Sequence, residues 1–252
     1  MAACMGPQGR LSGLTDGMEA LVSEGEKGWG PVAEDYADHA LASAYNAYYD
    51  RPAVLDLLGP VASRRVLDVG CGPGFYAEAM VGRGATVVGL DQSPEMVGLA
   101  QRRLGDRAEF RVHDLAEPIA WLPDESFDLA VMALVIHHLD DRVAALREIH
   151  RLLRPGGVLV VSTHHPSTDW RRRGGSYFDV EVVEETWSRG WCIRFWRQPL
   201  TATCAEFAEA GFLIERLVEP RPVAAMAETY PEEFEKLNIE PGFIDFRLLK
   251  LG

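Results

Sequence analysis

The stretch VLDVGCGPGF, residues 66–75, decides the fold. Its apolar first half has the composition of a buried parallel strand, interrupted only by Asp68. Glycines follow at alternate positions: Gly70, Gly72 and Gly74. Because glycine lacks a Cβ, the backbone there can turn tightly and approach a ligand. Residues 75–80 then have a helical pattern. A glycine loop between strand and helix is where an α/β sheet holds a nucleotide-like ligand.

Strands and helices alternate on both sides of this loop. The helix that follows Asp91 has Ser93 as its predicted cap and Pro94 in its first turn. The other predicted elements of this half are strand 65–69, helix 75–82, strand 86–90, strand 108–113, strand 127–134, helix 141–153, a stop at RPGG (154–157) and strand 158–164. This alternation predicts βαβ units and a parallel sheet with right-handed crossovers.

The rest of the chain departs from the alternation. Residues 165–199 contain four of the six tryptophans, and we expect this insertion to cover a substrate. After it come a helix with a capping box of Thr203 and Glu206, a strand at 212–218 and a strand at 242–250.

We predict a flexible tail at 1–30 and a single domain at 31–252. Within that domain, residues 31–60 form a helical lid, made of a helix over 32–50 that Pro52 interrupts and a short helix after it.

Composition limits the classes of partner. The 252 residues carry a formal net charge of −13, which argues against a nucleic-acid backbone or an anionic membrane as the main partner. The four cysteines show no paired spacing, so we expect reduced thiols, no metal site and a cytoplasmic protein. The longest apolar run, 129–136, is too short to span a bilayer.

The residues around the loop indicate which ligand it holds. Dinucleotide sites use GxGxxG, whereas the spacing here is GxGxG with an acid two positions before it. Asp68 would repel a pyrophosphate and suit a cationic amine. Asp91, at the next strand end, can accept from ribose hydroxyls, and Asp114, after the third, from an adenine amino group. An amine, a ribose and an adenine without phosphate describe S-adenosylmethionine.

Three stretches carry a family resemblance. They are VLDVGCGPGFYAEAMVGRGATVVGLDQSPEMV, FRVHDLAEPIAWLPDESFDLAVMALVIHHL and LLRPGGVLVVSTHHP. Together they resemble the class I S-adenosylmethionine-dependent methyltransferases, in their small-molecule, methyltransferase type 11-like branch. The resemblance runs from about Tyr36 to the C-terminus and is much more specific in the nucleotide half than in the substrate half.

The resemblance implies a Rossmann-like fold and a set of cofactor contacts. The fold would be a seven-stranded, mostly parallel sheet with helices on both faces and one antiparallel strand. The implied cofactor-binding residues are Tyr36, Asp68, Gly70, Cys71, Gly72, Gly74, Asp91, Gln92, Met96, Asp114, Leu115 and Ala133. Cys71 equally suits a small buried position.

Candidate catalytic residues follow the fourth and fifth strands. A methyl acceptor that arrives protonated needs a general base, and histidine titrates near neutral pH. The catalytic candidates are His138, His164 and His165. The substrate-binding candidates are His137, Trp170, Tyr177 and Trp191. Each of these is also a candidate cap or packing residue.

Several functions stay open. We expect an enzyme that methylates O, N or C of a small metabolite, as a monomer or homodimer. The alternatives are a member of the fold that binds the cofactor without methylating, such as a cyclase or binding module, and less favoured a tRNA methyltransferase or an NAD-dependent oxidoreductase. Fold alone does not choose among them.

Overall fold

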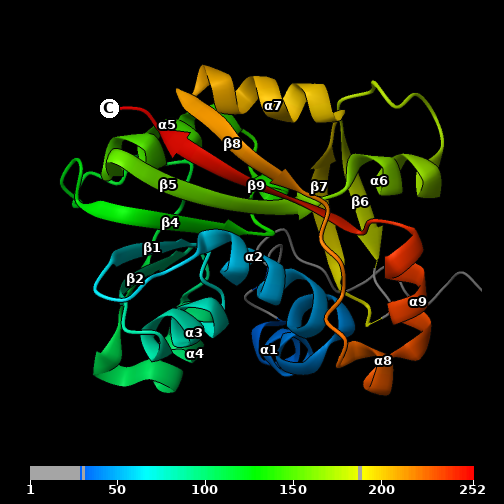
Figure 1. The fold of residues 1–252 in the computed structure, drawn as a ribbon, viewed down its shortest axis with the longest axis horizontal. Coiled ribbons are helices and arrows are strands. Elements are labelled where there is room, and N and C mark those ends of the chain that lie inside the picture. The colour runs from blue at the N-terminus through cyan, green and yellow to red at the C-terminus, as the bar shows by residue number, and fades with distance from the viewer. Residues whose placement is uncertain (1–28, 30–31, 187–188) are drawn as a thin grey trace, which may run out of the picture.

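A seven-stranded sheet forms the centre of the molecule, with helices on both faces (Figure 1). The computed structural model describes residue 29, residues 32–186 and residues 189–252, so the predicted tail lies outside the described residues except for Trp29. The sheet has the order β3-β2-β1-β4-β5-β9-β8. Its strands are β1 Arg65–Val69, β2 Thr86–Asp91, β3 Glu109–Val112, β4 Phe127–Ala133, β5 Leu153–His164, β8 Phe212–Val218 and β9 Phe243–Lys250.

The direction of the strands confirms the predicted fold class. β1 pairs in parallel with β2 and β4, and β4 pairs in parallel with β5. Only β9 runs antiparallel to its neighbours β5 and β8. The carboxyl ends of the parallel strands therefore meet at one edge of the sheet, where open α/β sheets bind ligands.

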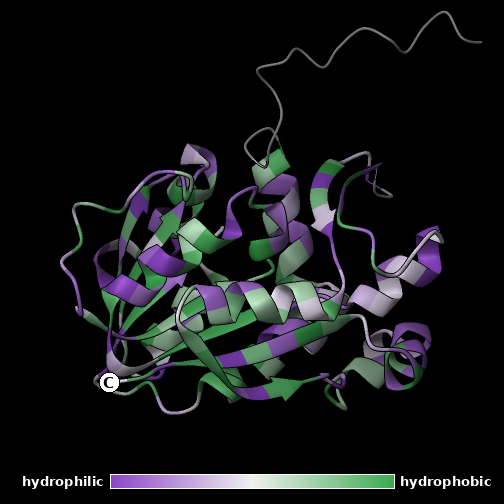
Figure 2. Ribbon diagram, turned by 90° about the horizontal axis from the view of Figure 1, so that it is seen from above, coloured by the Kyte–Doolittle hydropathy of each residue, from purple (hydrophilic) through white to green (hydrophobic). Residues whose placement is uncertain are grey.

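Helices cover the sheet in two layers, which Figure 1 shows above and below the strands. Helices α2, α3 and α4 pack on one face, where Val66 and Val131 are buried, and α5 and α7 pack on the other with Leu67 and Val69. The helices and short turns are α1 Ala33–Ala42, η2 Asn46–Asp50, α2 Arg51–Leu58, α3 Phe75–Gly82, α4 Pro94–Leu104, η3 Gly105–Arg107, η4 Ile136–His138, α5 Arg142–Leu152, α6 Pro166–Arg173, α7 Leu200–Glu209, α8 Met226–Thr229 and α9 Pro231–Ile239. Because both faces are covered, β1 is apolar on both sides, as parallel strands usually are. Hydrophobic residues accordingly dominate the layers that meet inside (Figure 2).

The N-terminal helices differ from the expectation. The predicted helix over 32–50 ends at Ala42, and a π-helical turn over Asn46–Asp50 leads directly into α2. Pro52 lies in the first turn of α2 and does not interrupt a helix, because the first turn needs no amide donor there. Since α2 belongs to the core, the lid stays a proposal for α1 and the turn after it.

Two further expectations are wrong. The RPGG stretch does not precede the fifth strand but lies inside β5, where the pairing with β4 shifts register. Thr203 and Glu206 form no capping box: the cap of α7 is Pro199, without a side-chain cap hydrogen bond. Instead Glu206 pairs with the Arg142 guanidinium at 2.7 Å, and Thr203 accepts a hydrogen bond from Gln198. The ion pair between Glu206 and the distant Arg142 has replaced the capping box that the local sequence predicts.

The insertion over 165–199 folds as α6 followed by a hairpin. The strands β6 Glu181–Thr186 and β7 Cys192–Arg197 form a sheet of their own, separate from the central one. Val183, Trp191, Ile193 and Phe195 make its buried side, on which Tyr36 of α1 packs. The described helices include none that is long and apolar enough to cross a membrane.

Candidate functional site

The glycine loop joins β1 to α3 at the carboxyl edge of the sheet. Gly70 has a φ of +68°, and a Cβ on it would lie 2.3 Å from Cγ2 of Val135, just after β4. Gly74 has a φ of +84° and lies against Ala100 of α4. Any larger residue at Gly70 would force the side chain of Val135 to move. Val135 therefore brings the β4 loop into direct contact with the glycine loop.

Asp68 lies at the tip of β1 with an unused acceptor. Its side chain is buried, and Oδ2 has no hydrogen-bond partner among the described residues. Burial, followed by the nearby Asp91 carboxylate, raises its pKa to about 7. Leaving a buried carboxylate unpaired costs free energy unless a cation or donor reaches it. This is the environment that suits the amino group of S-adenosylmethionine.

Asp91 closes the other side of the loop. Its Oδ2 accepts a hydrogen bond from the Gly72 amide and its Oδ1 one from the Ser93 amide, both at 2.9 Å. Each carboxylate oxygen keeps a second lone pair, so both can also accept from ribose hydroxyls. Ser93 caps α4 by accepting from the Met96 amide, as its sequence predicts. Met96 is buried beneath this turn, whereas Gln92 is exposed.

The adenine candidates lie farther along the same edge. Asp114 is exposed in the loop after β3, and its Oδ1 accepts a hydrogen bond from the Ala116 amide at 2.9 Å. Leu115 packs partly against the core. Ala133 ends β4 and is paired with Ser162 of β5. Cys71 is buried, and its amide donates to the Leu90 carbonyl, which is a structural role.

Tyr36 places α1 beside this edge. Its ring centroid lies 4.7 Å from that of Trp29 and 5.8 Å from that of Trp191 in the hairpin. Burial, then the Asp50 and Asp91 carboxylates, raises the pKa of the Tyr36 hydroxyl to about 12. That Tyr36 meets a cofactor bound at the glycine loop stays a prediction.

Arg51 is a site residue that the sequence reasoning missed. Its guanidinium lies 4.7 Å from the ring of Phe75, the residue after Gly74, and its Nη2 donates to the Ala40 carbonyl. Its buried Nε has no hydrogen-bond partner among the described residues. This arginine would therefore suit the carboxylate of a bound amino acid moiety. Only its neighbours in the fold reveal this, because it stands in an ordinary helical stretch.

Three histidines meet where β4 and β5 end. The ring centroid of His137 lies 4.2 Å from that of His164 and 4.3 Å from that of His138. His137 is hydrogen-bonded to the Thr163 hydroxyl at 3.0 Å, and the Nδ1 of His138 lies 2.9 Å from the Arg194 carbonyl. Burial lowers the pKa of His138 and of His164 to about 4 and that of His137 well below its usual range. All three rings are therefore neutral at pH 7.

His165 does not join this cluster. It caps α6, accepting from the Ser167 amide through Nδ1, and its Nε2 lies 3.0 Å from Glu219. Both ring nitrogens are thus engaged in structural contacts. β5 ends at His164, and the role of His165 as the cap of α6 turns its ring away from the cluster.

The aromatic candidates divide into two groups. Trp191 is buried, donates to Asp35 at 3.0 Å and joins Tyr36 of α1. Trp170 and Tyr177 instead contact each other, and the Tyr177 hydroxyl accepts from the Leu200 amide. Of these three residues, only Trp191 connects the hairpin to α1.

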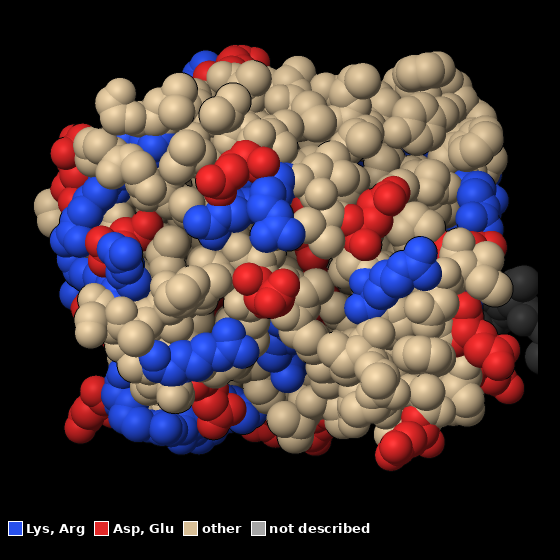
Figure 3. Space-filling model, in the orientation of Figure 1, with Lys and Arg blue, Asp and Glu red and all other residues tan. Residues whose placement is uncertain are grey.

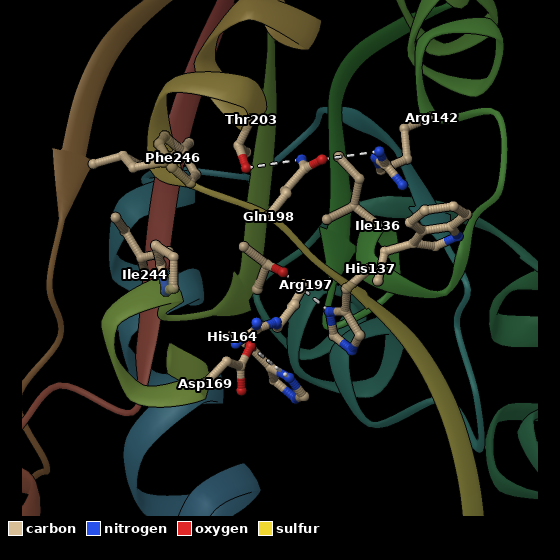
Figure 4. Close-up of a pocket in the computed structure, with 14 residues that line it drawn as sticks. Ile136, His137, Arg142, His164, Asp169, Arg197, Gln198, Thr203, Ile244 and Phe246 are labelled. Carbon is tan, nitrogen blue, oxygen red and sulfur yellow. Dashed lines mark hydrogen bonds and ion pairs between the residues drawn. The ribbon is translucent and has the colours of Figure 1, made fainter. Parts of the chain in front are cut away.

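An open hollow of about 450 Å³, including solvent at its mouth, lies behind the histidines. In Figure 4, His164 stands beside Asp169, with 3.8 Å between Nδ1 and Oδ2, while Arg142 and Gln198 line the far wall. His137 also lines the hollow, but the glycine loop does not. Trp170 and Tyr177 border a smaller adjoining hollow. Two of the three clustered histidines, His137 and His164, thus form part of the wall of the larger hollow.

Comparisons with known proteins agree with this geometry. The family model of the methyltransferase domain matches residues 67–161. An uncharacterized protein of Haemophilus influenzae is 27% identical over 82% of this chain and 89% of its own length. The ubiquinone biosynthesis O-methyltransferase of Pseudomonas syringae pv. tomato is 36% identical over 43% of this chain, and the matched part spans about half, 48%, of that enzyme.

A solved structure extends the likeness to most of the fold. The S-adenosylmethionine-dependent methyltransferase from Mesorhizobium loti is 25% identical, with a TM-score of 0.64 over 79% of this chain and 96% of that one. The family match covers the strand and loop units that hold Asp68 and Asp91. Residues 67–161 thus match the methyltransferase domain, and most of the chain shares the fold of a solved S-adenosylmethionine-dependent methyltransferase.

Proposed function

We propose that this protein transfers a methyl group from S-adenosylmethionine to O, N or C of a small-molecule acceptor. The observation that carries the proposal is the buried Asp68 carboxylate with its unused oxygen, next to a glycine loop that Val135 joins to the histidine cluster. A cation-binding carboxylate and a set of neutral imidazoles thus share one edge of the sheet.

The chain's own residues bind and orient the cofactor. Asp68 takes its amino group, Arg51 its carboxylate and Asp91 its ribose hydroxyls, while Met96 and Leu115 contact the adenine, and Asp114 accepts from its amino group. When bound, S-adenosylmethionine supplies a methyl group on a positively charged sulfur. Alignment of the acceptor is the main task of such an enzyme and is worth roughly 7–11 kcal/mol.

His138 is the proton acceptor in this proposal. If its Nδ1–H donates to the Arg194 carbonyl, the lone pair is left on Nε2, and the low pKa keeps the ring neutral. His164 is the second candidate, because its Nδ1 has no hydrogen-bond partner among the described residues. His165 is left out, since it caps α6.

Two observations favour a small acceptor. The relatives in ubiquinone biosynthesis methylate small molecules by name, although they match only part of this chain. Acidic and basic side chains are interspersed on the face in Figure 3, without a continuous basic surface for a nucleic-acid backbone. The hairpin and α1, joined through Trp191 and Tyr36, would enclose the acceptor.

Methylation of an acceptor panel tests the proposal. The full chain is incubated with S-adenosylmethionine and a mixture of phenols, amines and carbon acids, and products are read by mass spectrometry as gains of one CH₂. We expect a product with the wild type and none with Asp91→Ala. His138→Ala should reduce kcat by about 10²–10⁴, whereas His165→Ala should affect stability more than kcat. S-adenosylhomocysteine binding without any methylated product would support a non-methylating role instead.

A further inference from the structure

Two buried aspartates from distant parts of the chain meet beside the candidate site. Asp50 ends the π-helical turn η2 and is 1% exposed, and Asp245 in β9 is fully buried. Ser162 of β5 lies between the elements: it is paired in register with Asp245, and its side chain is near enough to Asp50 to lower the pKa of that carboxyl. Burial raises the pKa of Asp50 to about 6, and burial followed by the Asp50 carboxylate raises the pKa of Asp245 to about 8.

Most of the acceptor capacity of this pair is unused. Both oxygens of Asp245 and the Oδ1 of Asp50 have no hydrogen-bond partner among the described residues, while Asp50 Oδ2 accepts from the Tyr76 hydroxyl. Tyr49 also lies near both carboxyls; its hydroxyl accepts from the Gly242 amide and forms no hydrogen bond with either carboxyl. The nearest cation, Arg51, has a guanidinium that donates to a backbone carbonyl and stacks on a ring. A buried pair this poorly satisfied costs stability unless something binds it.

The pair lies along the same sheet from Ala133, which the family resemblance places beside the cofactor. Ala133, at the end of β4, is in register with Ser162, which is in register with Asp245. Neighbouring strands are about 4.8 Å apart, so the pair lies two strands from Ala133 along the carboxyl edge. His164 and Phe243 form the pair on the same face two residues nearer to the carboxyl end of β5. Their rings stack 6.0 Å apart.

We propose that Asp50 and Asp245 bind a positively charged amine of the methyl acceptor, so that the acceptor is an organic ammonium compound with an apolar or aromatic body. This inference rests on the proposed function and deepens it. Aromatic rings adjoin the pair: those of Tyr49 and Tyr45 lie 5.5 and 6.0 Å from Phe243. Such faces attract organic cations.

An ammonium ion fits better than the other cations at hand. The described residues contain no group of three histidines, cysteines or acids that could hold a metal ion. The amino group of the cofactor already has Asp68. With a pKa of about 8, Asp245 carries a proton at pH 7. The ammonium would displace it, so binding should release a proton.

Calorimetry on the full chain saturated with S-adenosylhomocysteine tests this inference. The probes are 2-phenylethylamine, 2-phenylethanol and 3-phenylpropanoate, which have similar bodies and positive, zero and negative charge. We expect the amine to bind at least tenfold more tightly than the other two. Titrations in phosphate and in Tris at pH 7 should differ, because their heats of ionisation report up to one proton released per amine bound.

Matched variants separate the outcomes. Asp245→Asn and Asp50→Asn should weaken amine binding at least tenfold and abolish the proton release, with S-adenosylhomocysteine affinity unchanged. The control is Asp128→Asn, at the opposite end of β4, where Asp128 binds Arg65 and Arg154. Equal binding of amine and alcohol, no amine binding at millimolar concentration, or full binding by Asp245→Asn would overturn the inference. Failure of the wild type to bind S-adenosylhomocysteine would instead contradict the proposed function, and amine titration of the unloaded protein would still test the pair.

Discussion

Two single residues, Gly70 and Asp68, shape the glycine loop at which we expect the cofactor to bind. Gly70 combines a positive φ with a neighbour, Val135, that leaves no room for a Cβ. Asp68 combines burial with an unused oxygen. In both cases a local cost in the folded chain is understandable if a ligand is held there, because strain and unsatisfied groups gather at functional sites. Substitutions at these two residues can therefore separate the effect on folding stability from the effect on cofactor binding.

Gly70→Ala should destabilise the protein and weaken S-adenosylhomocysteine binding. A positive φ alone costs an alanine about 1 kcal/mol, and the contact with Val135 should add about 1–3 kcal/mol. Gly105→Ala is the matched control, since Gly105 has a φ of +53° but no atom within 4 Å of the position that a Cβ would take. Urea denaturation measures both. Equal losses in the two variants would show that the Val135 contact does not constrain Gly70.

Asp68→Asn should stabilise the ligand-free protein at pH 8 while abolishing most of its affinity for S-adenosylhomocysteine. Burial raises the pKa of Asp68 to about 7 from an ordinary value near 3.8, so the folded protein resists its ionisation. The stability associated with its protonated form is present below pH 4 and lost as pH rises through 7, by up to roughly 4 kcal/mol. Urea denaturation at pH 5 and pH 8 should show a smaller decline for the variant. An identical pH dependence in both proteins would contradict this account.

At the scale of elements, α1 and the β6–β7 hairpin form one cover. Trp191 in the hairpin donates to Asp35 and packs its ring against Tyr36 and His39, all on α1. The central sheet is buried by other helices, so this cover can loosen without unfolding the core. We therefore propose that the lid is the interface between these two elements and not a single helix.

Trp191→Ala should loosen α1 while leaving the sheet intact. Removing a buried tryptophan typically costs 3–5 kcal/mol, and here much of it should appear locally. We expect amide exchange over residues 33–42 to accelerate at least about tenfold, equivalent to ~1.4 kcal/mol, with little change in β1 or β4. Trp170→Ala serves as control because Trp170 is 41% exposed and contacts Tyr177. Unchanged exchange in α1 would mean that the hairpin does not hold it.

For the whole molecule, sequence predicted the sheet far better than the site. Strands β1 and β8 and helix α3 match their predicted bounds residue for residue, because alternating burial and glycine punctuation are local signals. The hairpin was predicted only as a cover, since its pairing is not visible in composition. The cofactor residues were assigned through motif spacing, and their binding roles stay predictions.

The acceptor side depends on contacts between distant residues. Asp50 and Asp245 are 195 positions apart, and Arg51 reaches the glycine loop only through the fold. His164 and His165 looked equivalent in sequence, and only the cap of α6 separates His165 from His164. Thr203 and Glu206 match a capping pattern, but Thr203 accepts a hydrogen bond from Gln198 and Glu206 pairs with Arg142. Local patterns cannot specify which long-range partner a polar side chain will find.

Calorimetric titration with S-adenosylhomocysteine, with NAD as the control, tests the central claim most directly. If Asp68 and the glycine loop hold the amino acid moiety of the cofactor, the purified chain should bind S-adenosylhomocysteine with micromolar affinity and should not bind NAD. Mass spectrometry of the denatured sample first establishes that no ligand has co-purified. Binding of NAD alone, or of neither compound by ligand-free protein, would contradict the account.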